Sequence, residues 1–289
     1  MNRIGVSLHV GTVLDEPETS AQAVLKAEYG GVQSLFRFLR SMNVASIELR
    51  NVRKKMPPEK AIRAIHLCHD AGFDVSIHIA FEECTGAEYT SRVSNVLNEA
   101  LEGQKSLMLT LHPIASDRDL TAEKYESWSD VLCKRDERIC LALENMRVIN
   151  PNSEANRLAN VYHVVNSISE REGRGLCWDM GHYAYNIRAL GLDSETIPDY
   201  IIRKRMVHTH IHSLYIPDDA VLPEEMPRTD THYPIENKND PVRKYIRTLM
   251  ADGYSGIYNI ELEPERFSSI FSPRYGFETS VVHLMEMLS

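Results

Sequence analysis

The chain has 289 residues, of which 43% are hydrophobic and 25% are charged, an ordinary composition for a globular protein. Its formal net charge of -9 disfavours broad, non-specific binding to nucleic acid, because an acidic surface repels the phosphate backbone. The five cysteines form no CxxC pair and indicate reduced thiols. The first residues, MNRIGVSLHV, are too polar for a signal peptide, and no apolar run approaches the roughly 18 residues of a membrane span. We therefore expect a cytoplasmic protein with no membrane partner.

Short apolar runs alternate with amphipathic segments along the whole chain. The predicted strands are Ile4–Val10, Ala45–Arg50, Phe73–Ile79, Ser106–His112, Ile139–Glu144, Gly175–Asp179, Met206–His210 and Ile257–Glu261. The predicted helices are Ser20–Met42, Pro58–Ala71, Tyr89–Leu101, Thr121–Arg135, Ser153–Arg171, Pro241–Ala251 and Phe277–Leu288. Alternating strands and helices indicate a parallel sheet covered by helices. An open doubly wound sheet is disfavoured because no GxGxxG motif follows the first strand.

Eight such units predict an α/β fold, a single (β/α)8 TIM barrel over residues 1–289, a size close to the roughly 250 residues typical of that fold. The segment Ser213–Lys238, rich in Pro, Asp and Glu, follows the seventh strand. Long loops inside compact domains are usually functional. We expect this loop to lie over the C-terminal face of the barrel.

The predicted strands end in polar residues. In chain order these residues are His9, Arg50, His78, His112, Glu144, Asp179, His210 and Glu261. The simplest interpretation of any single histidine in this position is a hydrogen-bonded core residue. Barrel closure, however, gathers all the strand ends at one face, where the active sites of TIM barrels lie. Imidazole and carboxylate ligands without thiolate predict a divalent-metal site, for which we favour zinc, with manganese, magnesium, cobalt or iron as alternatives.

Two of these positions leave a choice of ligand. In MVHTHIHS, alternation places His208, His210 and His212 on one side of the strand, and we favour His210 over His212 as the ligand. In YNIELEP, Glu261 and Glu263 compete in the same way, and we favour Glu261.

Two further side chains near the strand ends bear on the same site. In CWDMGH, Asp179 ends a buried strand, and His182 follows on the turn that leads to the next helix, so both can face one cavity. Arg50 either pairs with Glu48 or holds an anionic substrate.

The segments ALEN, CWDMGH, HTHIH and NIELEP resemble the xylose-isomerase-like superfamily, which joins sugar isomerases and epimerases with endonuclease IV. In its isomerases and epimerases, two Glu, one Asp and one His hold one metal ion. The resemblance places those roles on Glu144, Asp179, His210 and Glu261.

Other segments are more similar to endonuclease IV. They are His9 in SLHVGT, His78 in SIHIAF, His112 in TLHPIAS, His182 in the D-x-x-H motif, and Asp230 and His232 in RTDTHYPI. This resemblance implies three zinc ions. His78, His112 and Glu144 would hold the first, Glu144, Asp179, His210 and Glu261 the second, and His182, Asp230 and His232 the third.

Two enzymatic functions follow from the resemblance. The first is hydrolysis of a phosphate ester, with Glu144 and Glu261 as catalytic residues and His9, Arg50 and Arg228 binding the substrate. The second is isomerisation or epimerisation of a sugar or sugar phosphate at a single metal. DNA is a less expected substrate, because the segments HIHS, YPIENKND and IAFEECTGAEY depart from the endonuclease pattern. A binding protein without activity is the third class, and the oligomeric state is open.

Overall fold

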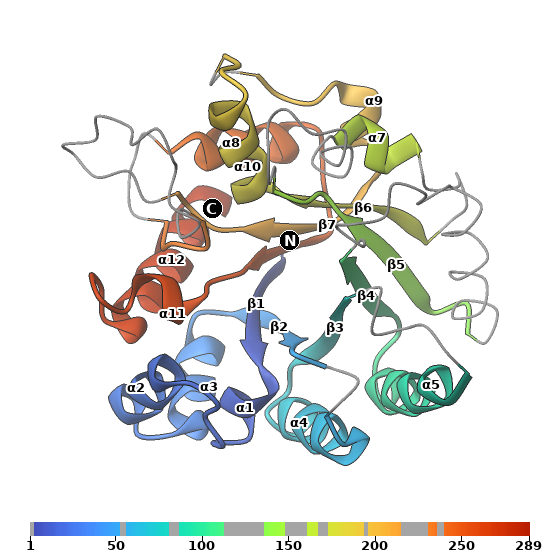
Figure 1. Ribbon diagram of the computed structural model, residues 1–289, viewed down its shortest axis with the longest axis vertical. Helices are drawn as coiled ribbons and strands as arrows, with labels where there is room; N and C mark the ends of the chain where they lie inside the picture. Colours follow the sequence, from blue (N-terminus) through green and yellow to red (C-terminus); the bar gives the residue numbers. More distant parts are fainter. Residues whose placement is uncertain are drawn as a thin grey trace.

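The computed structural model describes residues 3–52, 56–80, 87–112, 136–147, 161–166, 173–193, 196–214, 231–235 and 240–289; at 80, 87–92, 112, 162, 163 and 166 it describes the backbone only. Eight parallel strands form a closed ring in chain order, β8 pairing with β1 (Figure 1). They are β1 Arg3–His9, β2 Val44–Arg50, β3 Asp74–Ala80, β4 Leu107–His112, β5 Ile139–Glu144, β6 Arg174–Asp179, β7 Met206–Ile211 and β8 Ile257–Ile260. The predicted (β/α)8 TIM barrel is confirmed.

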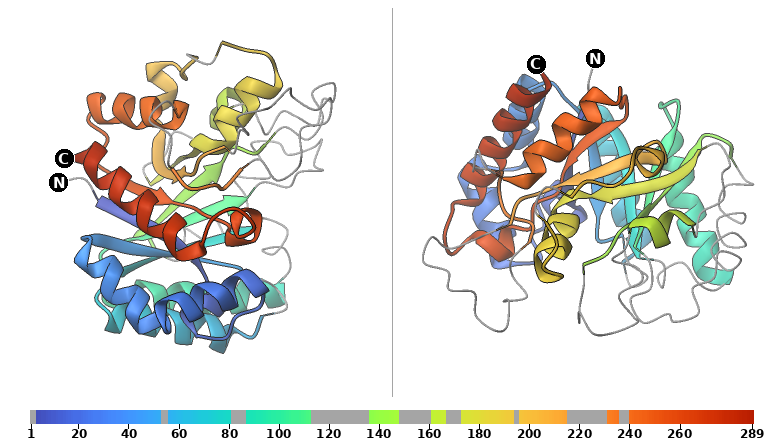
Figure 2. Two further views of the ribbon diagram at one scale, coloured as in Figure 1. Left: turned by 90° about the vertical axis from the view of Figure 1, so that its left-hand side faces the viewer. Right: turned by 90° about the horizontal axis from the view of Figure 1, so that it is seen from above.

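Helices surround the ring of strands (Figure 1). The described helices are α1 Val10–Val13, α2 Ser20–Tyr29, α3 Val32–Ser41, α4 Pro58–Asp70, α5 Ala87–Leu101, α7 Val161–Asn166, α8 Met180–Ala189, α9 Tyr200–Arg203, α10 Pro241–Ala251, α11 Pro264–Phe267 and α12 Pro273–Leu288. The start of β1 and the end of α12 lie on the same side of the molecule (Figure 2). No helix of the described ranges is both long and apolar enough to span a membrane.

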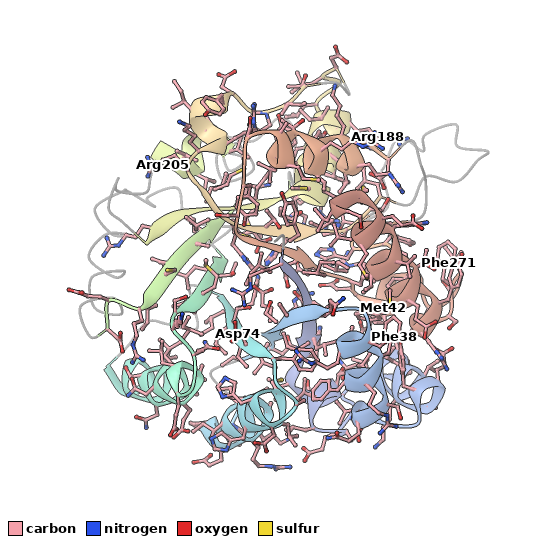
Figure 3. The ribbon with its side chains drawn as sticks, turned by 180° about the vertical axis from the view of Figure 1, so that it is seen from behind. Phe38, Met42, Asp74, Arg188, Arg205 and Phe271 are labelled. Atoms are coloured by element: carbon pink, nitrogen blue, oxygen red, sulfur yellow. The ribbon has the colours of Figure 1, made fainter. Side chains whose placement is uncertain are left out.

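The strands divide their side chains between two environments. In β2, Ile47 and Leu49 belong to the hydrophobic core, whereas Glu48, between them, hydrogen-bonds to Ser7 and Thr110 of other strands inside the ring. This division follows from the period of two along a strand, which sends successive side chains to opposite faces. Figure 3 shows side chains filling the centre of the ring. Polar residues are therefore concentrated along the barrel axis, and apolar residues pack the helices onto the strands.

The predicted helix over Ser20–Met42 is two helices, α2 and α3. Gly30 follows α2 in the left-handed conformation, with φ 73°, and Gly31 has φ 107°. The Gly30 N–H is bonded to the carbonyls of Lys26 and Ala27, which ends the helix. A glycine in this conformation is a common helix terminator, because a side chain there would meet its own backbone. The apolar spacing alone did not reveal this break.

The remaining differences lie at the ends of elements. The last helix begins at Pro273 rather than Phe277, because the side chain of Ser272 accepts a hydrogen bond from the Tyr275 N–H and caps it. The turn expected at His182 is the first turn of α8, which starts directly after β6. The predicted helix Thr121–Arg135 lies outside the described residues, and of Ser153–Arg171 only 161–166 are described and helical.

Only the two ends of the predicted loop Ser213–Lys238 belong to the described residues, as 213–214 and 231–235. These ends are joined by backbone hydrogen bonds: Ser213 N–H donates to the Tyr233 carbonyl at 2.8 Å, and Tyr233 N–H donates to the Ser213 carbonyl at 3.2 Å. The chain therefore returns to the end of β7 after the loop.

We expect Gly30→Ala to lower the free energy of unfolding by about 1 kcal/mol, because alanine resists the left-handed conformation. A Cβ at this position meets no atom within 4 Å, so the backbone alone accounts for the loss. Gly30→Asn is the matched control and should lose less, since asparagine tolerates this conformation. Urea denaturation measures the difference; equal stability of the alanine variant would contradict the explanation.

Candidate metal centre

Four ligand-type side chains meet at the C-terminal end of the barrel. Glu144, Asp179 and His210 lie at the ends of β5, β6 and β7, and Glu261 follows β8. Asp179 pairs in register with His210, and the Glu261 N–H donates to the Ile211 carbonyl, which brings the last residue to the same level. All four side chains are at most 1% exposed, and one ligand atom from each lies within 4.8 Å of the others. We refer to these four residues as the tetrad.

His210 lies between the two glutamates of the tetrad. Its Nδ1 is 2.9 Å from Glu261 Oε2 and 3.3 Å from Glu144 Oε2. His210 Nδ1 and Glu261 Oε2 are both buried, and neither makes a hydrogen bond within the described part of the chain. Two buried polar atoms that face each other without hydrogen-bond geometry are positioned like two ligands of one cation.

A second group of ligand-type residues adjoins the tetrad and shares Asp179 with it. This group consists of Asp179, His182, His212 and His232, all buried and with ligand atoms within 4.8 Å of one another. His182 Nδ1 lies 3.0 Å from Asp179 Oδ2 and 3.3 Å from Glu144 Oε1, so it contacts both groups. His212 Nε2 lies 3.0 Å from Asp179 Oδ1. We call this group the imidazole pocket.

The backbone pairing of Ser213 with Tyr233 brings His232 into the imidazole pocket. The two rings of His212 and His232 stack with their centroids 4.1 Å apart, and the His232 N–H donates to His212 Nδ1 at 2.9 Å. His232 has a φ of 67°, which is uncommon for a residue other than glycine. Because His212 Nδ1 accepts this hydrogen bond, its proton is on Nε2, the atom that faces Asp179.

Gly181 makes room for His212. A Cβ built at Gly181 would lie 2.0 Å from both Cε1 and Nδ1 of the His212 ring. The glycine of CWDMGH therefore has a steric role, since any side chain here would displace the imidazole.

Arg50 contacts the tetrad through Glu261. Its Nε lies 3.0 Å from Glu261 Oε1, and its Nη2 lies 3.0 Å from Glu263 Oε1, so the expected alternative of pairing with Glu48 is not observed. Burial raises the pKa of Glu261, but Arg50 and His210 lower it below the usual range. Burial likewise raises the pKa of Glu263, and Arg50 and Arg266 lower it to about 2. Both glutamates are ionised at neutral pH.

The electrostatics of the two imidazole environments differ. Burial by itself lowers the pKa of His210, but Cys177, Glu261, Glu48 and Glu144 around it raise the pKa well above the usual value. Burial lowers the pKa of His232, and the neighbouring His212 and His182 lower it further. Without a cation, His210 balances the tetrad carboxylates as an imidazolium, whereas His232 is neutral.

Of the other predicted site residues that the structure describes, one contacts the tetrad and one belongs to a separate group. His78 Nε2 is 3.0 Å from Glu144 Oε2, so this histidine reaches the tetrad. His9 Nδ1 is 2.6 Å from Asn51 Nδ2 and 3.1 Å from Gln22 Nε2, in a separate polar group. The side chain of His112 and all of Asp230 and Arg228 lie outside the described residues.

Within each of the two competing ligand pairs, the two candidates have different surroundings. His210 belongs to the tetrad and His212 to the imidazole pocket, so both face ligand-type residues. Glu261 belongs to the tetrad, whereas Glu263 is 20% exposed and pairs with Arg50 and Arg266. Sequence reasoning missed the contact between the Glu48 side chain and His210 Nε2. The one signal that pointed to it is that Glu48 lies two residues before Arg50, on the same face of the strand.

A closed (β/α)8 barrel with a cluster of buried imidazoles and carboxylates at the C-terminal strand ends defines the class of this protein. The sequence matches the family model of the xylose isomerase-like TIM barrel over residues 15–287. The chain belongs to this family. Among curated proteins, no significant match is found.

Solved structures share the fold at low sequence identity. A xylose isomerase-like TIM barrel protein from Mycobacterium smegmatis, in complex with magnesium, is 13% identical, with a TM-score of 0.51 over 100% of this chain and 98% of that chain. D-psicose 3-epimerase in the presence of D-fructose is 10% identical, with a TM-score of 0.48 over 98% and 96%. N-acetylneuraminate lyase from Aliivibrio salmonicida is 9% identical, with a TM-score of 0.44 over 99% and 78%. At these identities the likeness concerns the fold alone.

We expect Gly181→Ala to weaken Co²⁺ binding at least about 10-fold, the size of effect found for outer partners of metal ligands. The added methyl group collides with His212 and displaces a residue of the imidazole pocket. Gly191→Ala, just beyond the end of the same helix, is the control: its φ of 63° strains an alanine as at Gly30, but a Cβ there meets no atom within 4 Å and so displaces no residue of the pocket. Titration of both variants with Co²⁺ tests the assignment, and equal affinities would refute a steric role of Gly181 at the site.

Proposed function

We propose that this protein is a divalent-metal-dependent enzyme whose principal cation is held by Glu144, Asp179, His210 and Glu261. The observation that carries the proposal is the 2.9 Å approach of His210 Nδ1 and Glu261 Oε2, two buried atoms without hydrogen bonds in the described region. Buried carboxylates are costly unless they are paired or bind a metal. A cation held by these atoms would take over the neutralising role that the His210 imidazolium has without it.

The chemistry of the donors supports the same metals that the sequence indicated. The tetrad offers one imidazole and three carboxylates, a nitrogen and oxygen set that suits zinc, manganese, cobalt, iron or magnesium. We favour zinc because the adjoining pocket adds the imidazoles of His182 and His232, and imidazole is a ligand typical of zinc rather than magnesium.

We further propose that the imidazole pocket holds a second cation and that the protein hydrolyses a phosphate ester. Support comes from Asp179, which belongs to both groups, and from His182, which contacts Asp179 and Glu144 at once. Metal ions in such a centre lower the pKa of a bound water and neutralise the charge that develops on a phosphoryl group.

The residues around the tetrad would divide the remaining work. Glu144, which both His78 and His182 contact, would help to hold the cations and to orient the nucleophilic water. Glu261, held ionised by Arg50, would accept a proton. Arg50 already meets two carboxylates, so we assign phosphate binding mainly to Arg228, with His9 as a second contact to the substrate. Arg228 lies outside the described residues.

A sugar or sugar-phosphate isomerase or epimerase with one metal is the second candidate. The observation that favours it is that Glu144 and Glu261 approach the same nitrogen of His210. Glu144 Oε2 lies 3.3 Å from His210 Nδ1, and Glu261 Oε2 lies 2.9 Å from it. Two carboxylates on either side of a substrate carbon can exchange a proton as an acid–base pair. In this case the imidazole pocket would bind substrate instead of a cation.

Asp179→Asn is expected to abolish activity and metal retention, because Asp179 belongs to both groups. Glu144→Ala should do the same. Asp252→Asn is the control, since Asp252 pairs with Arg203 and belongs to neither group. Metal content is measured on purified protein by elemental analysis; wild-type content in both site variants would defeat the proposed centre.

His232→Ala is expected to reduce the number of bound metals by one without emptying the tetrad, because His232 belongs only to the imidazole pocket. His66→Ala, at a half-exposed histidine that pairs with Glu99, serves as the control. Unchanged stoichiometry in His232→Ala would argue for the single-metal enzyme. Two assays then separate the reactions: hydrolysis of an aryl phosphodiester, and uptake of solvent deuterium at the carbon next to a sugar carbonyl.

A further inference from the structure

A layer of buried polar side chains lies beneath the tetrad, inside the barrel. At its centre is Glu48 of β2, which has no exposed surface. Its carboxylate is surrounded by groups from four other strands: Ser7 of β1, Thr110 of β4, His208 and His210 of β7, and Asn259 of β8. Because side chains of several strands contact this carboxylate at once, they hold it in one orientation.

The contacts divide evenly over the two oxygens of Glu48. Oε1 accepts hydrogen bonds from Ser7 Oγ at 2.8 Å and from Asn259 Nδ2 at 3.2 Å. Oε2 accepts one from Thr110 Oγ1 at 3.0 Å and lies 3.0 Å from His208 Nε2. An ionised carboxylate is an acceptor only, so each of these neighbours contributes a hydrogen.

The same carboxylate reaches the underside of the tetrad. His210 Nε2 lies 3.0 Å from Glu48 Oε1, while Nδ1 of the same ring points to Glu144 and Glu261. Since Glu48 can only accept, His210 must carry its hydrogen on Nε2. The lone pair of a neutral His210 is then on Nδ1, on the side of the tetrad.

We propose that Glu48 is a positioning residue that fixes the ring orientation and tautomer of His210, so that Nδ1 presents its lone pair to the cation. This inference rests on the proposed metal centre. A carboxylate behind a ligand imidazole also makes the ligand nitrogen more basic, as in the carboxylate–histidine–zinc arrangement. The Glu48 charge therefore strengthens the bond that His210 makes to the metal without touching the metal itself.

Glu48 could instead be a metal ligand, because Glu48, His208 and His210 also have ligand atoms within 4.8 Å of one another. The hydrogen bonds argue against this role. Ser7, Asn259 and Thr110 already direct hydrogens at both carboxylate oxygens, so a cation there would meet donors instead of lone pairs. The positioning role requires no change in these contacts.

Glu48→Gln tests the inference, since glutamine keeps the shape and removes the charge. We expect its affinity for Co²⁺, measured by the visible absorption of the bound ion, to fall about 10- to 100-fold. Ser7→Ala is the matched control: it removes one hydrogen bond from Glu48 but leaves the contact with His210, and its Co²⁺ affinity should equal that of the wild type. Equal affinities of Glu48→Gln and wild type would overturn the inference.

A measurement on the wild type guards against a variant that fails to fold. In the Zn²⁺-loaded protein, ¹⁵N NMR of the histidine rings should show His210 bound through Nδ1, with a slowly exchanging hydrogen on Nε2. The His210 signal is identified by its loss in His210→Gln. Coordination through Nε2 would overturn the role of Glu48.

The same titrations separate the failure of this inference from failure of the proposed function. If wild type binds no Co²⁺, or Asp179→Asn binds it equally well, the metal centre itself is wrong. If wild type binds Co²⁺ through the tetrad and Glu48→Gln binds it equally well, only the role of Glu48 is wrong.

Discussion

The need to neutralise buried carboxylates organises this structure. Glu48, Glu144, Asp179 and Glu261 are each at most 1% exposed, and a buried ion without partners costs several kcal/mol even after relaxation. Each of the four carboxylates contacts at least one imidazole, and Glu261 also contacts the Arg50 guanidinium. Histidines therefore surround these four buried carboxylates, and the same contacts create the two adjoining sets of ligand atoms.

Barrel closure supplies the geometry for this arrangement. Parallel strands point their C-terminal ends to one face, so residues more than a hundred positions apart, such as Glu144 and Glu261, approach the same nitrogen of His210. Alternation along β2 contributes the outer contacts: Glu48 holds His210 from below, and Arg50 holds Glu261 from the side. β2, which provides no tetrad residue itself, thus contacts two of the four.

The choice between the two candidate reactions depends on the imidazole pocket. A single-metal isomerase needs only the tetrad, whereas a hydrolase with several metals uses the neighbouring imidazoles as well. His212 is not among the nine residues to which the resemblance assigns zinc, yet its ring lies between Asp179 and the His232 backbone. Gly181 provides the space for that ring, so the pocket depends on a residue without a side chain.

The sequence by itself determined the barrel and the strand-end residues, because a period of two, helical spacing and polar strand ends are local properties. It placed Glu144, Asp179, His210 and Glu261 on one face, and it favoured His210 and Glu261 over their neighbours. It missed the break at Gly30, and it paired Glu48 with Arg50 as one alternative. Only the tertiary structure decided that Glu48 contacts His210, that Arg50 contacts Glu261, and that Ser213 and Tyr233 bring His232 onto His212. These contacts join residues far apart in the chain, and their partners are set by strand register and barrel closure, which no local pattern contains.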